Sequence, residues 1–495
     1  MWAVTAWGVA LARMSALVCV AAVCAAPAAA GASNVPGPSA GREVVLVANA
    51  EGGTVSVVDA RTLRVLRELN VLPDGPEATL LEDDPAQALI RQRVVEAAGG
   101  TNYAQDQDVS PDGRTLYVSR GHRGDVAAFD LGSGQLLWKV AIPGFRSDHM
   151  TISRDGRLLY VSALTDNVVV GVDTRAQAIV GSAPAGQWPH DNHLSADGRR
   201  LYNGSIGTII APEEARDATP PPPYRLTVFA TADLGIQRSY TFERGLRPIV
   251  ITEDEREMYA QLSELHGIVA FDLVEGRITR RLELPVDPGV TETDYDFEAP
   301  HHGLAISRDE RTLCAAGRAS DYVALVSTAS FRAVTIIEVD DAPGWAATGP
   351  DGRHCFVANT RADTLSVISY AKRREVARLR VGNGPKQIEA ARIPEAVLCA
   401  QPGVPGCSRE VRLTRRCVPG GRLRVGLAGD VDAVRRVGFR IGRRRVGRDA
   451  LPPFRRAVPR AVLDRTQARR VRAVAVFDDR RTSLWRRLPR RCGAG

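Results

Sequence analysis

A turn signal that returns about every 42 residues constrains this sequence more than any other feature. It consists of Ser, Thr or Gly, then any residue, then Asp followed by Gly or Glu. Successive signals are 43, 42, 57, 55 and 42 residues apart, and they begin at Ser110, Ser153, Ser195, Thr252, Ser307 and Gly349. Asp followed by Gly favours a tight turn, because glycine adopts positive φ and the Asp side chain bonds to nearby backbone. A period of this length indicates a repeat architecture.

Short β-rich runs follow each turn signal. After the first signal they occupy residues 115–119 and 126–130, and a polar turn with a last run at 135–142 completes the unit. The apolar residues alternate with period two, which indicates strands, whereas helical repeats of similar length would show a period near 3.6. Four short strands per repeat are typical of a β-propeller blade.

The number of blades follows from the two ends of the repeat region. Residues 44–48, 54–59 and 65–70 supply only three strands before the first complete turn signal. The missing innermost strand is predicted at 387–392, after the last full repeat. Seven blades would then close with a strand from each end, which removes the exposed sheet edges. The sequence therefore predicts an all-β protein with a seven-bladed β-propeller over residues 43–397.

Two strand segments carry a resemblance to a known family. Leu116-Tyr-Val-Ser119 and Cys355-Phe-Val-Ala-Asn359 resemble the strand signature of the YVTN family of β-propellers, and the resemblance covers about 350 residues. It implies a seven-bladed propeller of YVTN repeats. It implies little about activity, because propellers are scaffolds that host many functions.

The first 32 residues are typical of a secretion signal peptide. Arg13 supplies a positive charge, residues 14–27 form an apolar run, and residues 28–30 are three alanines that suit cleavage. A membrane anchor is disfavoured because the run is short, and no later segment resembles a membrane span. A lipoprotein is disfavoured because Cys19 and Cys24 each follow a valine. The sequence predicts a protein that is secreted or associated with the cell envelope and does not span the membrane.

A second domain is predicted at residues 398–495. This region contains 26 arginines, no lysine and seven acidic residues, so it carries a charge of +19 against −11 for the rest of the chain. Residues 423–427, 437–441 and 471–477 alternate in the manner of half-buried strands. In the last run, Val471 and Ala473 fall on one side and Arg472 on the other. We expect a small, arginine-rich, β-sandwich-like domain.

An exported chain can form disulfides. In the C-terminal domain we expect Cys399 to pair with Cys407 and Cys417 with Cys492, although four cysteines allow three connectivities. A zinc site is the alternative, weakened by irregular spacing and by the absence of histidine after His354. The sequence leaves open whether Cys314 and Cys355 pair; they lie at neighbouring but non-equivalent strand positions, which disfavours a bridge.

The arginine-rich composition leaves the role of the C-terminal domain open. The arginines form either a solvated face or a surface that docks to an anionic cell-envelope polymer or to the acidic propeller. Nucleic acid is not the expected partner of an exported protein.

Histidines gather on one predicted face of the propeller. The between-blade links and the loops between second and third strands share this face, called the top, and seven of the eight histidines map to it. Aligning the repeats on the turn signal places seven residues at one equivalent position around the axis, namely Gln105, Asp148, His190, Arg247, His302, Gly344 and Lys386. The following position holds Asp106, His149, Asp191, Pro248, Gly303, Trp345 and Gln387.

Two interpretations of this face remain open. In the first, the polar groups hydrate a channel and satisfy one another. In the second they form a concave site. The candidate ligand-binding residues are Asp106, Asp148, Asp191, Arg247, Trp345 and Lys386. The candidate metal ligands, for copper or zinc, are His149, His190, His193, His301 and His302, with nearby Asp side chains orienting the rings.

The leading functional hypothesis is an exported binding protein that engages an unidentified ligand or partner at the top of its propeller. The alternative is a copper- or zinc-dependent oxidoreductase with its site at the channel mouth, and a calcium-dependent hydrolase is a third class. No Cys-x-x-Cys-His haem motif and no Gly-x-Ser-x-Gly nucleophile motif are present. The sequence leaves open whether the protein is an enzyme.

Overall fold

The computed structural model describes most of the chain after residue 40. The described residues are 41–76, 89, 91–93, 95, 101–207, 224–295, 298–401, 403–407, 411–419, 422–458, 462–463, 470–477 and 481–489. The predicted signal peptide at 1–32 lies outside them. So does most of the segment 71–105 between the first and second blades, in which Leu89, residues 91–93 and Val95 are helical.

Seven four-stranded antiparallel sheets form the blades, and each runs from an innermost to an outermost strand. The first three blades are β28 (Pro385–Pro394), β1 (Gly41–Asn49), β2 (Thr54–Asp59) and β3 (Arg64–Asn70); β4 (Asp106–Val109), β5 (Thr115–Arg120), β6 (Asp125–Asp130) and β7 (Leu136–Ala141); and β8 (Ser147–Ile152), β9 (Leu158–Ala163), β10 (Val168–Asp173) and β11 (Ala178–Pro184).

The remaining four blades follow in chain order. They are β12 (Pro189–Leu194), β13 (Arg200–Ser205), β14 (Tyr224–Ala230) and β15 (Ile236–Phe242); β16 (Leu246–Ile251), β17 (Glu257–Leu262), β18 (Gly267–Asp272) and β19 (Arg277–Glu283); β20 (Leu304–Ile306), β21 (Thr312–Gly317), β22 (Tyr322–Ser327) and β23 (Arg332–Glu338); and β24 (Pro343–Thr348), β25 (His354–Asn359), β26 (Thr364–Ser369) and β27 (Arg374–Arg380).

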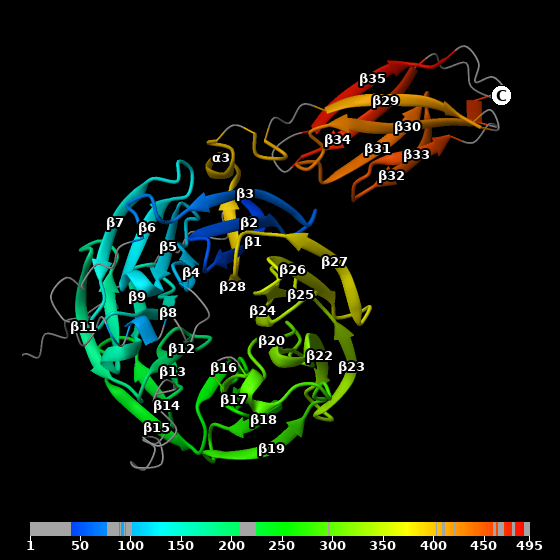
Figure 1. Ribbon diagram of the computed structural model, residues 1–495. Helices are drawn as coiled ribbons and strands as arrows, with labels where there is room; N and C mark the ends of the chain where they lie inside the picture. The colour runs from blue at the N-terminus through cyan, green and yellow to red at the C-terminus, as the bar shows by residue number, and fades with distance from the viewer. Residues whose placement is uncertain are drawn as a thin grey trace, which may run out of the picture. The chain divides into compact units, whose positions relative to one another are not determined.

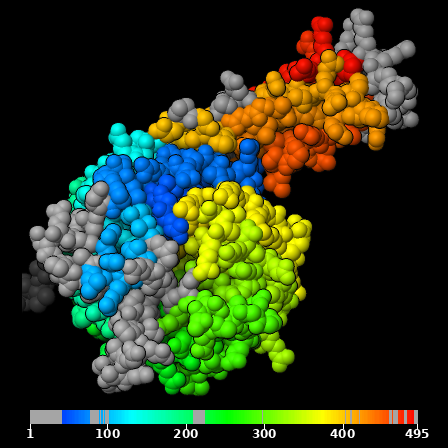
Figure 2. Space-filling view, viewed as in Figure 1, coloured from blue at the N-terminus to red at the C-terminus, as the bar shows by residue number. Residues whose placement is uncertain are grey.

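The seven sheets are arranged in a ring with the innermost strands toward its centre (Figure 1). In the space-filling view the blades follow one another around this ring in chain order (Figure 2). The first blade takes its innermost strand from the end of the repeat region, because β28 pairs antiparallel with β1 from Gly41 opposite Pro394 to Asn49 opposite Pro385. Closure by a strand from each end confirms the prediction made from counting strands.

The turn signals build the expected structure. In the second blade the Ser110 amide donates to the Thr115 carbonyl over 2.9 Å, and the Ser110 hydroxyl donates to Asp112 Oδ1 over 2.6 Å. Gly113 has φ 71°, and a Cβ there would lie 2.7 Å from the Arg392 carbonyl oxygen, so only glycine fits without strain.

Apolar side chains fill the spaces between neighbouring blades. Each of the seven blade-to-blade contacts has its own buried cluster. Leu159 and Val161 of β9, for example, pack against Val126 and Ala128 of β6. Period-two alternation causes this packing, because a blade presents one set of side chains to each neighbour. The outermost strands are largely exposed.

Helices are short in the described chain. Those whose bounds are described are the 3-10 turns η1 (Gly121–Arg123), η2 (Leu164–Asp166), η3 (Glu292–Asp294) and η5 (Arg318–Ser320), and the helix α3 (Glu395–Leu398) after the last propeller strand. None of the helices in this part of the chain has the length and apolar composition needed to cross a bilayer.

The C-terminal strands form two antiparallel sheets around a common core, as a sandwich-like domain requires. The first sheet contains β29 (Val411–Val418), β30 (Arg422–Gly429) and β33 (Arg455–Val458), and the second contains β32 (Arg444–Asp449), β31 (Arg436–Ile441), β34 (Arg470–Val476) and β35 (Arg481–Arg487). Val471 and Ala473 are fully buried with Phe439 and Val425 in the core, whereas Arg472 lies on the other side of β34.

Two disulfides are present among the described residues. Cys399 pairs with Cys407, as predicted. Cys492, the predicted partner of Cys417, lies outside the described residues. The sequence disfavoured a bridge between Cys314 and Cys355, but they form a disulfide across the sixth and seventh blades. Side chains alternate along a strand, so two neighbouring blades face each other with odd positions of one and even positions of the other. Cys314 and Cys355 differ by one position in the aligned repeats, and their side chains therefore point toward each other.

We predict that the double variant Cys314→Ala/Cys355→Ala is destabilised by about 2–4 kcal/mol, because the bridge joins positions 41 residues apart in a buried cluster. Denaturant unfolding under oxidising conditions measures the change. The matched variant Cys399→Ala/Cys407→Ala spans only 8 residues and should lose less. Equal midpoints for the parent and the Cys314/Cys355 variant would contradict this prediction.

Candidate functional site

The equivalent position predicted from the repeats forms a connected group at the propeller axis. These seven residues, called the mouth ring, are Gln105, Asp148, His190, Arg247, His302, Gly344 and Lys386. They precede or begin the innermost strands. Six of them are joined in one series of side-chain contacts that runs in the order Lys386, Gln105, Asp148, His190, His302 and the Gly344 carbonyl.

His190 and His302 face each other across the axis. His190 Nδ1 donates to Asp148 Oδ2 over 2.8 Å, and His302 Nδ1 donates to the Gly344 carbonyl over 2.8 Å. These acceptors fix both tautomers, so both Nε2 atoms carry lone pairs, and they lie 3.4 Å apart. Burial lowers the pKa of His190 to about 4, although Asp148 opposes this, and burial lowers that of His302 well below its usual range.

His149 lies beside this pair on β8. Its Nδ1 donates to Asp106 Oδ2 over 3.1 Å, and its Nε2 lies 3.1 Å from the Gln105 side-chain nitrogen. Trp345 stacks on the His149 ring at 4.6 Å between centroids. Burial opposes protonation, but the hydrogen bond to Asp106 and the charge of Asp148 outweigh it and raise the pKa of His149. Asp148, His149 and His190 offer ligand atoms within 4.8 Å of one another.

Buried Arg146 and half-buried Lys386 converge on one amide oxygen. Lys386 Nζ donates to Gln105 Oε1 over 3.1 Å, and Arg146 Nη2 reaches the same atom over 3.4 Å. The Asn102 side-chain amide donates to it as well. The other end of Arg146 contacts His122 Nε2 at 2.7 Å. Among the described residues, no carboxylate lies within ion-pair distance of Arg146 or Lys386.

Arg247 adds a third cation at the mouth, and it is buried. Its Nε donates to the Ser263 hydroxyl over 3.0 Å, and its Nη2 lies 4.0 Å from Glu298 Oε2. Burial lowers the pKa of Arg247 to about 10, although Glu298 opposes this. Arg247 and Arg318 both act electrostatically on His302. Positive charge therefore lies beside His302, whereas the Asp148 carboxylate contacts His190.

Five of the seven residues at the second position of the repeat line a channel of about 440 Å³, namely Asp106, Asp191, Pro248, Trp345 and Gln387. Asp191 accepts from the Ile249 amide over 2.9 Å and lies 3.3 Å from His193 Nε2. Burial and the charge of Asp106 raise the pKa of Glu389 to about 8 in the same channel. The channel therefore contains several acidic residues, whereas the cations Arg146, Arg247 and Lys386 lie at the mouth.

Some predicted site residues lie apart from the mouth. His301 Nε2 contacts His266 Nδ1 at 3.1 Å and the Tyr322 hydroxyl at 3.0 Å, so its ring belongs to a separate cluster with blades five and six. His193 and Asp191 belong to the channel. The described mouth thus unites Asp148, His149, His190 and His302 but not His193 or His301.

Sequence reasoning missed Arg146, Asn102 and His122 as site residues. Arg146 lies in a between-blade link two positions before Asp148, and nothing in the repeat pattern distinguishes it from a solvated arginine. A link that precedes an innermost strand was the one available signal, because such links gather at the top face.

Comparisons with known proteins support the fold. Hydrazine synthase of Kuenenia stuttgartiensis is similar in structure, with a TM-score of 0.51, 18% identity, and coverage of 66% of this chain and 92% of that one. A putative 6-phosphogluconolactonase from Bacteroides fragilis gives a TM-score of 0.52, 13% identity, and coverage of 71% and 98%. No protein-family model and no curated protein matches this chain. These similarities establish a β-propeller fold. They show neither the function of the protein nor membership of the YVTN family.

We predict that Lys386→Met stabilises the protein at about pH 6 and that the gain shrinks as pH rises from about 7 toward 10. Partial burial and the charge of Arg146 lower the pKa of Lys386 to about 7, so at lower pH the folded state must hold a half-buried ammonium that the unfolded state solvates fully. Above its unfolded pKa this cost disappears. Thermal unfolding at several pH values measures the difference.

The control for this prediction is Lys372→Met, because Lys372 is exposed in the turn before β27. Its effect on stability should not vary with pH over this range. A pH-independent effect of Lys386→Met would contradict a depressed pKa at the mouth.

Proposed function

We propose that this protein is a ligand-binding propeller that holds a small anion, bearing carboxylate or phosphate groups, at the mouth ring. One observation carries the proposal. Arg146 and Lys386 are turned toward the same Gln105 oxygen, which also accepts from Asn102. Asp148 acts electrostatically on both cations, but no described carboxylate contacts either of them. An anion at this position would supply the missing acceptors.

A buried charge without a partner lowers the stability of the folded state. Removing a cation from water costs several kcal/mol unless a counter-charge and hydrogen bonds replace the hydration shell. A carbonyl oxygen has two lone pairs, so three donors on Gln105 Oε1 leave the cations incompletely satisfied. Arginine's planar fork suits carboxylate and phosphate, and a charge-assisted hydrogen bond is about twice as strong as a neutral one.

A second arginine in the same propeller provides an internal comparison. Arg120 is fully buried, and its Nε and Nη1 atoms donate to Asp125 and Asp74, each over 2.6 Å. That arginine is fully paired, as stability requires. Arg146 is only 7% exposed, and its described side-chain partners are the neutral groups of His122 and Gln105. The contrast supports a ligand-binding role for Arg146.

We predict that the parent protein binds inorganic phosphate or citrate and that Lys386→Gln or Arg146→Gln weakens binding about tenfold or more. Each variant removes a charge that would contact the anion. Affinity should also fall as pH rises above about 7, because the pKa of Lys386 is lowered to about 7. Isothermal titration calorimetry at pH 6 and pH 8.5 measures both effects.

Lys372→Gln removes an equal charge from an exposed position and should leave the affinity unchanged. If this control weakens binding as much as Lys386→Gln does, the anion binds by general charge and the mouth is not its site. Absence of binding to both anions by the parent protein would also count against the proposal.

A specific observation favours a second candidate function, a copper or zinc centre. Two Nε2 lone pairs 3.4 Å apart repel each other unless a cation lies between them. For an ion bonded to both nitrogens at about 2.0–2.1 Å, the nitrogen–metal–nitrogen angle would be about 110°, which is close to tetrahedral. Asp148 and the Gly344 carbonyl hold the Nδ1 atoms, as partners of ligating histidines do.

The cationic surroundings rank this function second. Arg247 and Arg318 disfavour a divalent cation at His302, and only two histidines face one another directly. A bound ion would keep open coordination positions for an anionic ligand, and copper would add the redox chemistry of an oxidoreductase. The two functions are therefore compatible at one mouth.

We predict that, if this centre forms, purified protein holds near-stoichiometric copper or zinc and His190→Ala/His302→Ala loses it. Elemental analysis measures the metal content after reconstitution and gel filtration. His354→Ala is the matched control, because His354 contacts Asp351 away from the mouth. No retained metal in the parent would eliminate the metal centre and leave anion binding untouched.

The setting proposed for this function is outside the cytoplasm. Two described disulfides favour an oxidising compartment, and a signal peptide at residues 1–32 would deliver the chain there. We also propose that the propeller is of the YVTN type, on the strand signatures alone.

A further inference from the structure

The four-stranded sheet of the C-terminal domain has an outer face with an unusual composition. Side chains alternate along each strand, so residues opposite one another in the register share this face. Gly438 of β31 lies at its centre, opposite Arg448 on β32 and Val474 on β34. Arg440 lies opposite Arg472, and Arg472 lies opposite Trp485 on β35.

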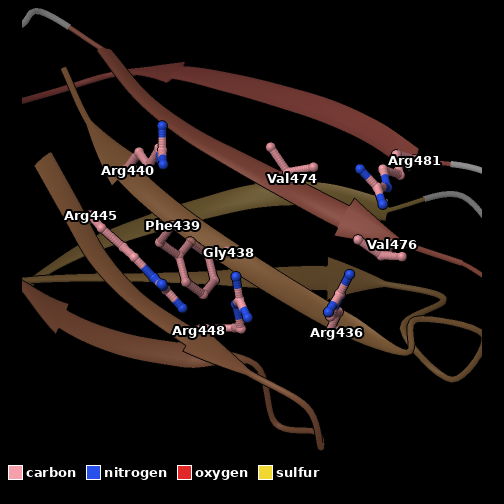
Figure 3. Close-up of a pocket in the computed structure, with 9 residues that line it drawn as sticks. All are labelled: Arg436, Gly438, Phe439, Arg440, Arg445, Arg448, Val474, Val476 and Arg481. Atoms are coloured by element: carbon pink, nitrogen blue, oxygen red, sulfur yellow. The ribbon is translucent and has the colours of Figure 1, made fainter. Parts of the chain in front are cut away.

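Five guanidinium groups surround a hollow of about 300 Å³ on this face (Figure 3). Gly438, Val474 and Val476 form its floor. The five arginines come from three strands, are exposed, and are Arg436, Arg440, Arg445, Arg448 and Arg481.

The described residues provide no counter-charge for these five arginines. The nearby Asp449 carboxylate contacts Arg456. Five like charges around one hollow repel each other, and binding of a polyanion would remove that repulsion. Charge complementarity therefore specifies a partner that carries several anionic groups.

The hollow depends on Gly438. A Cβ added at this residue would meet no atom within 4 Å. The space above Gly438 is therefore open, and any larger amino acid at this position would place its side chain in the hollow. Substitution here would fill the hollow without disturbing the core, because Gly438 alternates with the buried Val437 and Phe439.

An aromatic surface continues the same face. Trp485 is 57% exposed, and the Arg472 guanidinium lies 5.0 Å from its ring centroid. Arg472 also donates to the Ser483 hydroxyl over 2.9 Å. An exposed indole beside a row of arginines offers a flat apolar surface next to anion-binding groups. Sugar rings have flat C–H faces, and acidic glycans carry anionic groups between them.

We propose that this arginine hollow and Trp485 bind a linear anionic glycan. Neighbouring strands are about 4.8 Å apart, and Arg436 and Arg440 are about 13 Å apart along β31, so the cations can meet successive charges on one polymer. A glycan is favoured over nucleic acid because the described disulfides indicate an oxidising compartment. This proposal is independent of the ligand at the propeller mouth.

The test uses the full chain and two model glycans, heparin and polygalacturonate, with single-stranded DNA as the comparison. At about 0.15 M salt, Arg436→Gln/Arg440→Gln/Arg448→Gln should weaken glycan binding about tenfold or more. Gly438→Leu should weaken it several-fold with no change in charge. Binding should also shift the fluorescence of Trp485, and Trp485→Ala should abolish that shift.

The matched control is Arg412→Gln/Arg416→Gln/Arg424→Gln, which removes three exposed charges from the three-stranded sheet. It should change the affinity by less than about twofold. Equal losses in the two triple variants would show binding by general charge and overturn the proposal. Tighter binding of DNA than of both glycans would replace the glycan with nucleic acid. No binding of either glycan by the parent would also overturn it.

Discussion

The antiparallel pairing of β28 with β1 joins the two ends of the repeat region, including Arg392 and Glu43, which are 349 positions apart. Without this pairing the first blade would lack its innermost strand and the ring would expose sheet edges. Closure also completes the circle of innermost strands. Residues that are equivalent in the repeats then converge at one end of the axis, and Lys386, which begins the closing strand, reaches Gln105 in the second blade.

This convergence forces polar groups together in a space that excludes most water. Away from the mouth, Arg120 shows a buried charge that is fully paired, with Asp125 and Asp74. At the mouth the propeller leaves neutral histidines and cations in one network with Asp148 as the central acceptor. A network of this kind is the arrangement that a bound anion, or an ion between two imidazoles, would complete. The mouth therefore differs from the rest of the core in chemistry rather than in fold.

The C-terminal domain differs from the propeller mouth because its charged side chains lie on the surface. Each strand directs apolar residues such as Val437 and Phe439 into the core and arginines away from it. The excess positive charge of this region is consequently a surface property and costs little folding free energy. Its distribution is uneven, since Gly438 and the register of β31, β32 and β34 gather arginines around one hollow. The two domains thus present two separate cationic surfaces of very different burial.

The sequence alone determined the seven-bladed ring, because the turn signal and period-two alternation are local and repeat along the chain. It also determined which residues share the mouth ring, because equivalent positions in a closed ring must meet at the axis. It could not distinguish His302 from His301, since adjacent residues turn to opposite sides of a link whose path depends on the fold. It likewise failed for Cys314 and Cys355, whose bridge depends on the parity with which two blades face each other. Only the tertiary structure decided that Arg146 and Lys386 have no described carboxylate in contact and that arginines surround Gly438. Both features depend on distances between strands that are far apart in the sequence.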